Sequence, residues 1–90
     1  MDKQPDYEAL RKQLNEHQWP SLYMFKFIVP SDNKKIAQVE SLFGDDAEVK
    51  RQPSSNGKYT SITAREVMLT VDDVLMVYQQ ASTIEGIIAL

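Results

Sequence analysis

The feature that most constrains this chain is the run LYMFKFIV at residues 22–29, which is apolar on both of its faces. The run lies between Pro20 and Pro30, and its aromatic and β-branched residues are typical of a strand. Because successive side chains of a strand point to opposite sides, one face carries Tyr23, Phe25, Phe27 and Val29, and the other carries Leu22, Met24, Lys26 and Ile28. Only Lys26 interrupts the apolar character, so we expect a central strand covered at least in part on both sides.

Two segments after this strand predict a helix and an edge strand. The helix covers residues 31–43, where Ser31 or Asp32 can cap its start and Gly44 follows its end. Residues 47–52 alternate only weakly between apolar and charged positions and are followed by a proline. Charged side chains and a terminal proline are typical of a strand at the edge of a sheet.

The second half of the chain predicts a hairpin, a helix and a last strand. The sequence SSNG at residues 54–57 favours a hairpin turn, because Asn-Gly readily adopts the left-handed backbone that such a turn needs. A returning strand covers residues 58–69, with a bulge or an end near Glu66, where the apolar alternation breaks. The sequence TVDD at residues 70–73 resembles a capping box that opens the next helix, and residues 84–90 form an apolar last strand.

The order of these elements predicts the fold class. Residues 5–17 form a short leading helix, and the remaining order, β-α-β-β-α-β, is that of the ferredoxin-like split βαβ arrangement. We therefore expect an α+β sandwich with a four-stranded antiparallel sheet and two helices on one face. Residues 1–18 would be an N-terminal helical extension, and residues 19–90 would form the ferredoxin-like domain.

Right-handed crossovers place the first and third strands of such a sheet at its centre. We expect the Tyr23, Phe25, Phe27 and Val29 face, together with Ile62 and Ala64, to lie against the helices. The opposite face would then be open and would carry Leu22, Met24, Lys26, Ile28, Ser61, Thr63 and Arg65.

The amino-acid composition limits the kinds of catalytic and metal site that this chain can form. The chain has 90 residues, no cysteine and one histidine. The lack of cysteine excludes a disulfide framework, a thiol nucleophile and a thiolate zinc site. His17 could be a general base, but it has no companion nucleophile, and a histidine at a helix C-terminus is the plainer interpretation. We therefore predict a non-enzymatic protein with no catalytic residue, no metal and no cofactor.

The net charge and the N-terminal sequence allow predictions about the binding partners of the protein and its location in the cell. A formal net charge of −3 disfavours nucleic acid and anionic membranes as partners. RNA-binding modules with this strand order need aromatic side chains on the exposed sheet face, and the third sheet segment offers Ser61, Thr63 and Arg65 there. Residues 1–20 carry charges throughout and contain no apolar run that suits a signal peptide. We expect a cytoplasmic protein without a nucleic-acid or membrane partner.

Two segments carry a family resemblance. The first is WPSLYMFKF at residues 19–27, in which an aromatic-Pro-Ser sequence leads into an aromatic strand with one lysine. The second is PSSNGKYTS at residues 53–61, which resembles the Pro-Ser-Ser-x-Gly-x-Tyr-x-Ser motif of the YbeD-like family of small bacterial proteins of unknown function. The resemblance covers about residues 19–90. It implies a ferredoxin-like fold akin to the ACT regulatory domains, which often dimerise and bind amino acids, and it implies no activity.

Two groups of residues are candidates for binding a ligand. The turn residues Ser54, Ser55, Asn56 and Gly57 could form an anion-binding nest of backbone N–H groups, or could simply make a hairpin turn. Lys26 and Arg65 are the cations of the open face and could receive a carboxylate or phosphate, or could be solvated charges. The predicted ligand-binding set is Lys26, Arg65, Ser54, Ser55, Asn56, Gly57, Tyr59 and Ser61.

The apolar residues of the open face predict an interface. Leu22, Met24 and Ile28 would form a contiguous exposed patch, and such a patch usually marks a contact surface. Either the leading helix covers it or a second copy of the chain does. We expect a regulatory or adaptor module that binds a small anionic metabolite or amino acid at the open face or at a dimer seam. The alternative is a scaffold module that binds only another protein.

Overall fold

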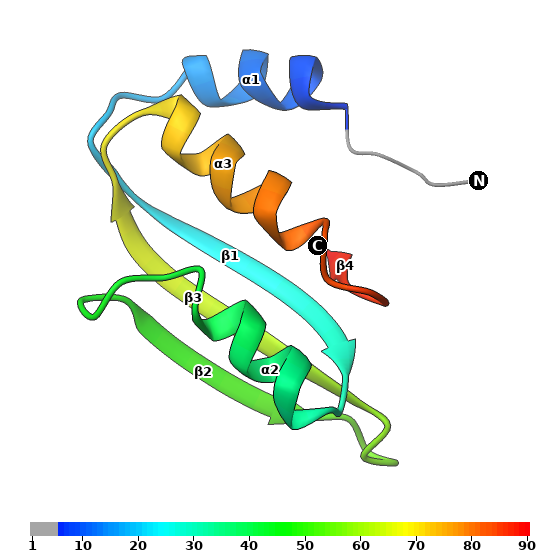
Figure 1. The fold of residues 1–90 in the computed structure, drawn as a ribbon. Helices are drawn as coiled ribbons and strands as arrows, with labels where there is room; N and C mark the ends of the chain where they lie inside the picture. Colours follow the sequence, from blue (N-terminus) through cyan, green and yellow to red (C-terminus); the bar gives the residue numbers. More distant parts are fainter. Residues whose placement is uncertain (1–5) are drawn as a thin grey trace.

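The computed structural model describes residues 6–90, over which three helices and four strands alternate (Figure 1). Their bounds are α1 Tyr7–Asn15, β1 Ser21–Pro30, α2 Asn33–Glu40, β2 Glu48–Pro53, β3 Tyr59–Met68, α3 Val71–Ala81 and β4 Ile88–Ala89. The expected α+β class and the expected element order are confirmed. Residues 1–5 of the predicted N-terminal extension lie outside the described residues.

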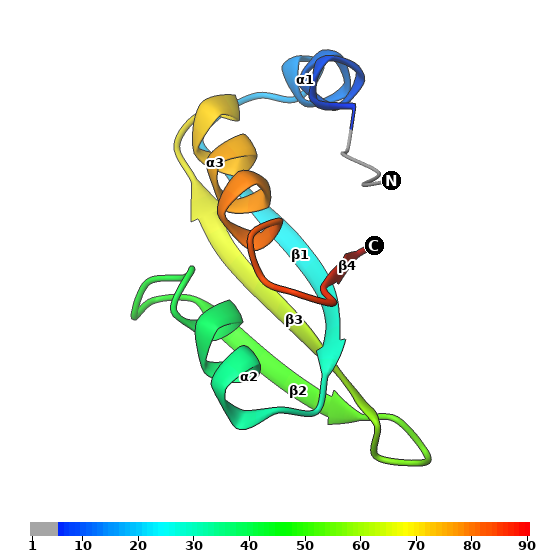
Figure 2. The same cartoon turned by 45° about the vertical axis from the view of Figure 1, so that its right-hand side comes forward.

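The four strands form one antiparallel sheet in the order β2-β3-β1-β4. Strands β1 and β3 are therefore central, as the handedness of the crossovers predicts. Helices α2 and α3 lie on one face of this sheet (Figures 1 and 2). The opposite face, which we call the open face, consists of the even-numbered residues of β1, β2 and β4 and the odd-numbered residues of β3.

The core lies between the sheet and the two crossover helices. Its fully buried side chains from the sheet are Phe25, Phe27, Val29, Ile62 and Ala64, each with no exposed surface. Val39 of α2 and Val74 of α3 meet them from the helix side and are equally buried. Burying one large apolar side chain contributes about 1.5–3 kcal/mol, so the predicted helix-covered face is also the main source of stability.

The pairing of β1 with β3 corrects one expectation. Its register is continuous from Ser21 opposite Met68 to Pro30 opposite Tyr59, so the bulge predicted near Glu66 is wrong, and the strand ends at Met68, two residues further on. Glu66 occupies a helix-facing position near the end of β3, where its carboxylate accepts a hydrogen bond from the Gly44 N–H at 3.0 Å. The charged residue thus interrupts the apolar pattern without interrupting the strand, because it satisfies a backbone donor of the loop after α2.

Both crossover helices begin at the predicted caps. Asp32 caps α2, since its carboxylate accepts from the Lys34 N–H at 2.8 Å. The Thr70 hydroxyl accepts from the Asp73 N–H at 3.1 Å and caps α3 in the same way. Each of these bonds satisfies one of the free N–H groups that open a helix. Helix α2 ends at Glu40, earlier than expected, and a turn then carries Phe43 back onto the core.

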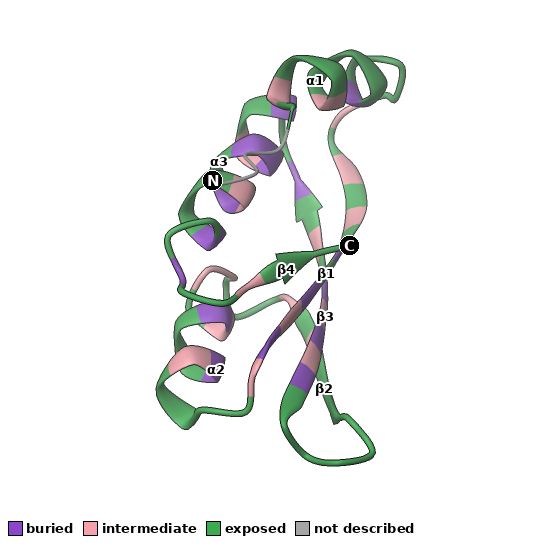
Figure 3. Cartoon of the chain, turned by 90° about the vertical axis from the view of Figure 1, so that its right-hand side faces the viewer, coloured by how far each residue is buried: buried purple, intermediate pink, exposed green. Residues whose placement is uncertain are grey.

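Helix α1 packs on α3 and does not cover the open face (Figures 1 and 3). Leu14 is buried in the core, and its carbonyl oxygen accepts a hydrogen bond from the Trp19 indole N–H at 2.9 Å. Arg11 Nη2 lies 2.8 Å from the Asp72 carboxylate at the start of α3. These contacts hold α1 on the helix layer, so the alternative in which the leading helix covers the apolar patch is wrong.

Strand β4 is much shorter than the predicted strand over residues 84–90. Only Ile88 and Ala89 pair, with Ile28 and Phe27 of β1. The preceding residues form turns because Gly86 adopts a left-handed φ of 82° close to Pro30. A Cβ at Gly86 would lie 3.0 Å from Pro30 Cγ, so this close turn requires glycine. Among the residues that the structure describes, the short β4 leaves the first half of β1 without a neighbouring strand on its outer side.

Candidate functional site

The open face carries large apolar side chains that nothing in residues 6–90 covers. Leu22 and Met24 are 61% and 55% exposed, and Ile28 of the same strand is half-buried beside β4. The three residues predicted as an interface therefore lie on one uncovered surface. The structure adds Val67, Ile88 and Leu90, all of them exposed.

The sequence analysis did not assign Val67 to the open face, and the reason is the expected bulge. Because the strand was expected to bulge or end near Glu66, Val67 had no assigned face. Strict alternation continued past Glu66 places Val67 on the same side as Arg65, and the register sets it opposite Leu22. This alternation was the signal that could have found it.

The open face also carries more positive than negative side chains. Lys26, Lys50 and Arg65 lie on it, with Glu48 as the acidic member of β2. Arg65 Nη1 lies 3.9 Å from the Glu48 carboxylate, and both side chains are more than half exposed, so this ion pair is weak. Among the ion pairs of residues 6–90 none involves Lys26 or Lys50. The surface is thus locally basic on a chain whose formal charge is −3.

The two predicted cations do not converge on one point. Lys26 is opposite Thr63, whereas Arg65 is opposite Met24, so they are diagonal neighbours on adjacent strands. Diagonal positions of an antiparallel pair are about 7–8 Å apart at the backbone. Arg65 also faces Glu48 on its other side. The pair therefore distributes positive charge over the open face and does not form a single clamp.

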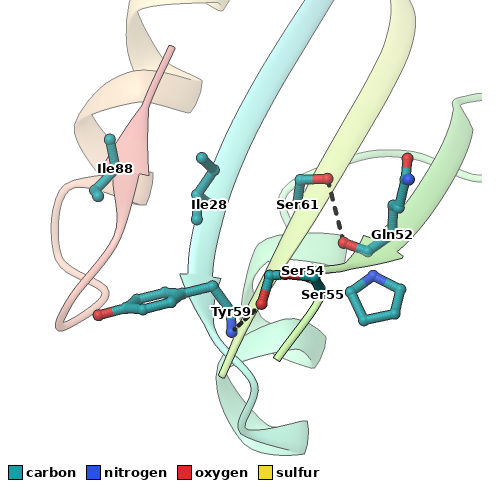
Figure 4. A pocket seen from close by; sticks show the side chains of 8 residues that line it. Ile28, Gln52, Ser54, Ser55, Tyr59, Ser61 and Ile88 are labelled. Carbon is teal, nitrogen blue, oxygen red and sulfur yellow. Dashed lines mark hydrogen bonds between the residues drawn. The ribbon is translucent and has the colours of Figure 1, made fainter. Parts of the chain in front are cut away.

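A shallow hollow of about 520 Å³ lies at the end of the open face where the hairpin begins (Figure 4). It brings together four of the predicted ligand residues, Ser54, Ser55, Tyr59 and Ser61, with Gln52, Pro53, Ile28 and Ile88. Lys26, Arg65, Asn56 and Gly57 are not among the residues that line it. The hollow is therefore mixed in character, with two isoleucines and a tyrosine on one side and serines on the other.

The turn between β2 and β3 uses its polar groups internally. The Asn56 side-chain oxygen accepts from the Lys58 N–H at 3.0 Å, and the Ser54 hydroxyl accepts from the Tyr59 N–H at 3.1 Å. The Gly57 N–H donates to the Ser54 carbonyl at 2.9 Å. Gly57 has a φ of 75°, as the Asn-Gly signal predicts. The Ser54 and Gly57 N–H groups already have local acceptors and are not available to an anion, so the geometry favours the hairpin-turn interpretation over a nest formed by all four residues.

The most perturbed titratable group lies on the other side of the sheet. The Tyr78 and Tyr23 hydroxyls are 3.0 Å apart within the aromatic cluster under α3. Burial raises the pKa of the Tyr78 phenol above its ordinary value, and the hydrogen bond with Tyr23 raises it further. A phenol that stays protonated in a packed aromatic cluster stabilises the core and has no access to the open face.

The remaining candidate is His17, which is exposed just after the C-cap of α1. Its backbone N–H donates to the Leu14 carbonyl at 3.1 Å and continues the end of the helix. Across residues 6–90 no three His, Asp or Glu side chains gather closely enough to hold a metal ion. No helix in this part of the chain has the length and apolar character needed to cross a membrane.

The fold and this surface define a small α+β protein with one helix-covered sheet face and one uncovered face that is half apolar and locally basic. The model of the family described as Protein of unknown function (DUF493) matches residues 14–90. The chain therefore belongs to that family, and the match begins at the buried Leu14 of α1. No curated protein and no solved structure matches the chain.

Proposed function

We propose that this protein is a non-enzymatic adaptor module that binds another protein through the open face. The proposal depends mainly on the exposed apolar row of Leu22, Met24 and Val67, which lies beside Lys26 and Lys50, two cations without an ion pair in residues 6–90. Extended apolar patches rimmed by polar groups mark contact surfaces on soluble proteins. The cations add electrostatic complementarity, which steers encounter with an acidic partner.

The finer classification belongs to the same proposal. The order β2-β3-β1-β4, with both crossover helices on one face, supports a ferredoxin-like sandwich related to the ACT domains. The sequence PSSNGKYTS at residues 53–61 lies inside the matched region and supports the YbeD-like assignment. We place the protein in the bacterial cytoplasm on the strength of that resemblance.

A second candidate function is binding of a small anionic metabolite or amino acid. The hollow of about 520 Å³ at Tyr59 and Ser61 is the observation that favours it, since its size suits a small ligand. Lys26 and Arg65 would attract the anion toward the open face. This candidate includes a homodimer in which the ligand lies at the seam. We rank it second because the Ser54 and Gly57 N–H groups of the turn already have acceptors and the two cations lie outside the hollow.

A pair of methionine variants tests the adaptor proposal. Met24 on the open face and Met76 on α3 are both 55% exposed, so Met24→Glu and Met76→Glu introduce the same charge at equally accessible positions. We expect a partner captured from cell extract by the wild-type chain to be lost with Met24→Glu and retained with Met76→Glu. Equal capture by both variants would contradict the use of the open face.

A thermal-shift screen separates the two candidates. Ligand binding raises the melting temperature with ligand concentration relative to the dissociation constant. A shift with an amino acid or nucleotide that disappears in Lys26→Ala, Arg65→Ala would favour the metabolite candidate. Light scattering at several concentrations would show whether the 10.3 kDa chain forms a dimer.

A further inference from the structure

The outer edge of β1 is only half used. Strand β4 pairs with Phe27 and Ile28, and beyond it the Leu90 N–H donates to the Lys26 carbonyl at 2.9 Å. In an antiparallel ladder the N–H and C=O of one residue point to the same side, and those of the next residue point to the other. The Lys26 bond therefore shows that even-numbered residues of β1 direct their backbone groups outward.

The outward groups of Met24 and Leu22 lie past the end of this pairing. No strand of the described chain reaches them. In Figure 3, α1 lies above β1 and α3 lies to its left. The Leu22 carbonyl has one contact there, a long bond of 3.4 Å from the neighbouring Ser21 hydroxyl. Unpaired backbone donors and acceptors at a sheet edge form a template for another extended chain.

The opposite edge of the sheet is protected. The same alternation of backbone groups continues through the β1–β3 and β2–β3 registers. It directs the backbone groups of Val49, Arg51 and Pro53 of β2 toward the outer edge of the sheet. Pro53 has no N–H to offer, and Arg51 is held by two hydrogen bonds to Glu40 of α2, at 2.7 and 3.2 Å. Prolines and charged side chains are the usual means of blocking an edge strand. The edge of β1 over residues 21–25 has neither.

The charges beside the β1 edge indicate the kind of occupant. A strand added next to Leu22 and Met24 would place alternate side chains on the open face, close to those two apolar residues and to Lys26. Lys26 has no acidic partner in residues 6–90, and Arg65 is opposite Met24 one strand further in. A segment with carboxylates and apolar side chains is complementary to this surface. A second copy would instead join two basic faces into one sheet.

We propose that an extended segment of an acidic partner protein adds to the sheet alongside β1, through backbone hydrogen bonds to Met24 and Leu22. This proposal rests on the adaptor function and specifies its mode. Backbone pairing supplies affinity, and alternate side chains over the open face supply specificity, as in other cases of strand addition.

Fluorescence anisotropy with defined peptides tests this mode. The probe, called the Glu-Val peptide, is a fluorescein-labelled peptide in which every second residue is Val or Glu in turn and the residues between them are Thr, so that one face of the added strand carries both apolar side chains and carboxylates. Its controls are the same peptide with N-methylated backbone amides and a peptide with Lys in place of Glu. We expect the wild-type chain to bind the first peptide and to bind each control at least about tenfold more weakly. Each tenfold loss of affinity, whether from lost backbone pairing or from lost charge complementarity, corresponds to about 1.4 kcal/mol of binding free energy.

Two proline variants locate the site on the protein. Met24→Pro removes an outward N–H and places a ring in the path of an added strand, at an edge position where proline is tolerated. Val49→Pro makes the same change on the β2 edge. We expect Met24→Pro to weaken peptide binding about tenfold or more and Val49→Pro to leave it unchanged. The N-methylated peptide gives the same information on wild-type protein if Met24→Pro does not fold.

The outcomes separate strand addition from the broader adaptor function. Absence of binding by the Glu-Val peptide to wild-type protein would overturn strand addition. So would binding that survives N-methylation and Met24→Pro but is lost in Val67→Glu, although that result would support docking on the open face. Concentration-dependent self-association that Met24→Pro abolishes would assign the edge to a second copy and would also overturn the proposal.

Discussion

Strand β1 has two apolar faces with opposite surroundings. Phe25 and Phe27 are fully buried under the helices, whereas Leu22 and Met24 on the other face are more than half exposed. The two faces are similar in composition, so hydrophobicity alone does not explain the difference. The two crossover helices lie on one side of the sheet, and that topology assigns one face to the core and leaves the other exposed in residues 6–90.

The largest expected contrast comes from truncating one side chain on each face. Phe25 packs against the rings of Tyr23, Phe43 and Tyr78, with centroid separations of 4.7, 5.4 and 5.3 Å. We expect Phe25→Ala to lower the free energy of unfolding by about 3–5 kcal/mol. Met24→Ala should change it by less than about 0.5 kcal/mol, as is usual for exposed positions. Urea unfolding measures both, and equal losses would mean that the open face is covered within one chain.

A smaller contrast comes from adding volume at neighbouring residues of β3. Ala64 faces the helices with no exposed surface, and Thr63 lies next to it on the open face. Ala64→Leu should destabilise by about 1–3 kcal/mol, because a packed core has no room for the added methyl groups. Thr63→Leu should stay within about 0.5 kcal/mol of the wild type. Chemical denaturation of the two variants under identical conditions provides the measurement, and a costly Thr63→Leu would argue against an uncovered face.

Alkaline pH should weaken the helix-covered face through Tyr78. Its raised pKa means that the unfolded chain loses this proton near the ordinary value of about 10 while the folded chain keeps it. The stability that this group contributes is therefore complete below about pH 10 and is lost as the pH rises further. Between pH 10 and 11 we expect the wild type to lose about 1 kcal/mol relative to Tyr78→Phe.

The control for this prediction is the difference between the same two proteins at lower pH. Below about pH 9 the difference between wild type and Tyr78→Phe should be constant and should reflect the lost hydroxyl bond to Tyr23, about 1 kcal/mol. Thermal unfolding followed by circular dichroism from pH 7 to 11 measures both regimes. A difference that does not change with pH would contradict a protonated Tyr78 in the core.

The smallest contrast concerns the charged residues at the end of β3. Glu66→Ala removes the acceptor of the Gly44 N–H, and we expect a loss of about 1 kcal/mol in unfolding free energy. Glu66→Gln keeps an acceptor and should recover part of that loss. Arg65→Ala on the open face should change stability by less than about 0.5 kcal/mol, because its ion pair is long and exposed. Guanidinium unfolding in a matched series would show this order, and a larger loss for Arg65→Ala would reverse it.

Most of the fold could be predicted because its signals are local. The caps at Asp32 and Thr70 and the turn at Gly57 follow from hydrogen bonding and backbone freedom within a few residues. The expected bulge at Glu66 and the expected length of the last strand were wrong for a different reason. Glu66 is stabilised by Gly44, which is distant in the sequence, and β4 is shortened by a turn against Pro30.

The candidate surface was predicted in part. Leu22, Met24 and Ile28 were identified from alternation within one strand, which is a local pattern. Val67, Ile88 and Leu90 join them only through the pairing of three strands, and Lys50 joins the cations through the pairing of β2 with β3. Ser54, Ser55, Tyr59 and Ser61 were expected to bind a ligand, and they line the hollow. Their role in binding remains a prediction.

The sequence by itself determined the α+β class, the order of the elements and the two apolar faces of the first strand. Those properties depend on side-chain alternation, capping and turn chemistry, all of which act over short distances along the chain. Only the tertiary structure decided that α1 lies on α3, and that within residues 6–90 one face of the sheet is uncovered and the outer edge of β1 is half free. These three properties depend on contacts between segments that are distant in the sequence. The packing of the helices and the length of β4 decide which backbone and side-chain groups have neighbours.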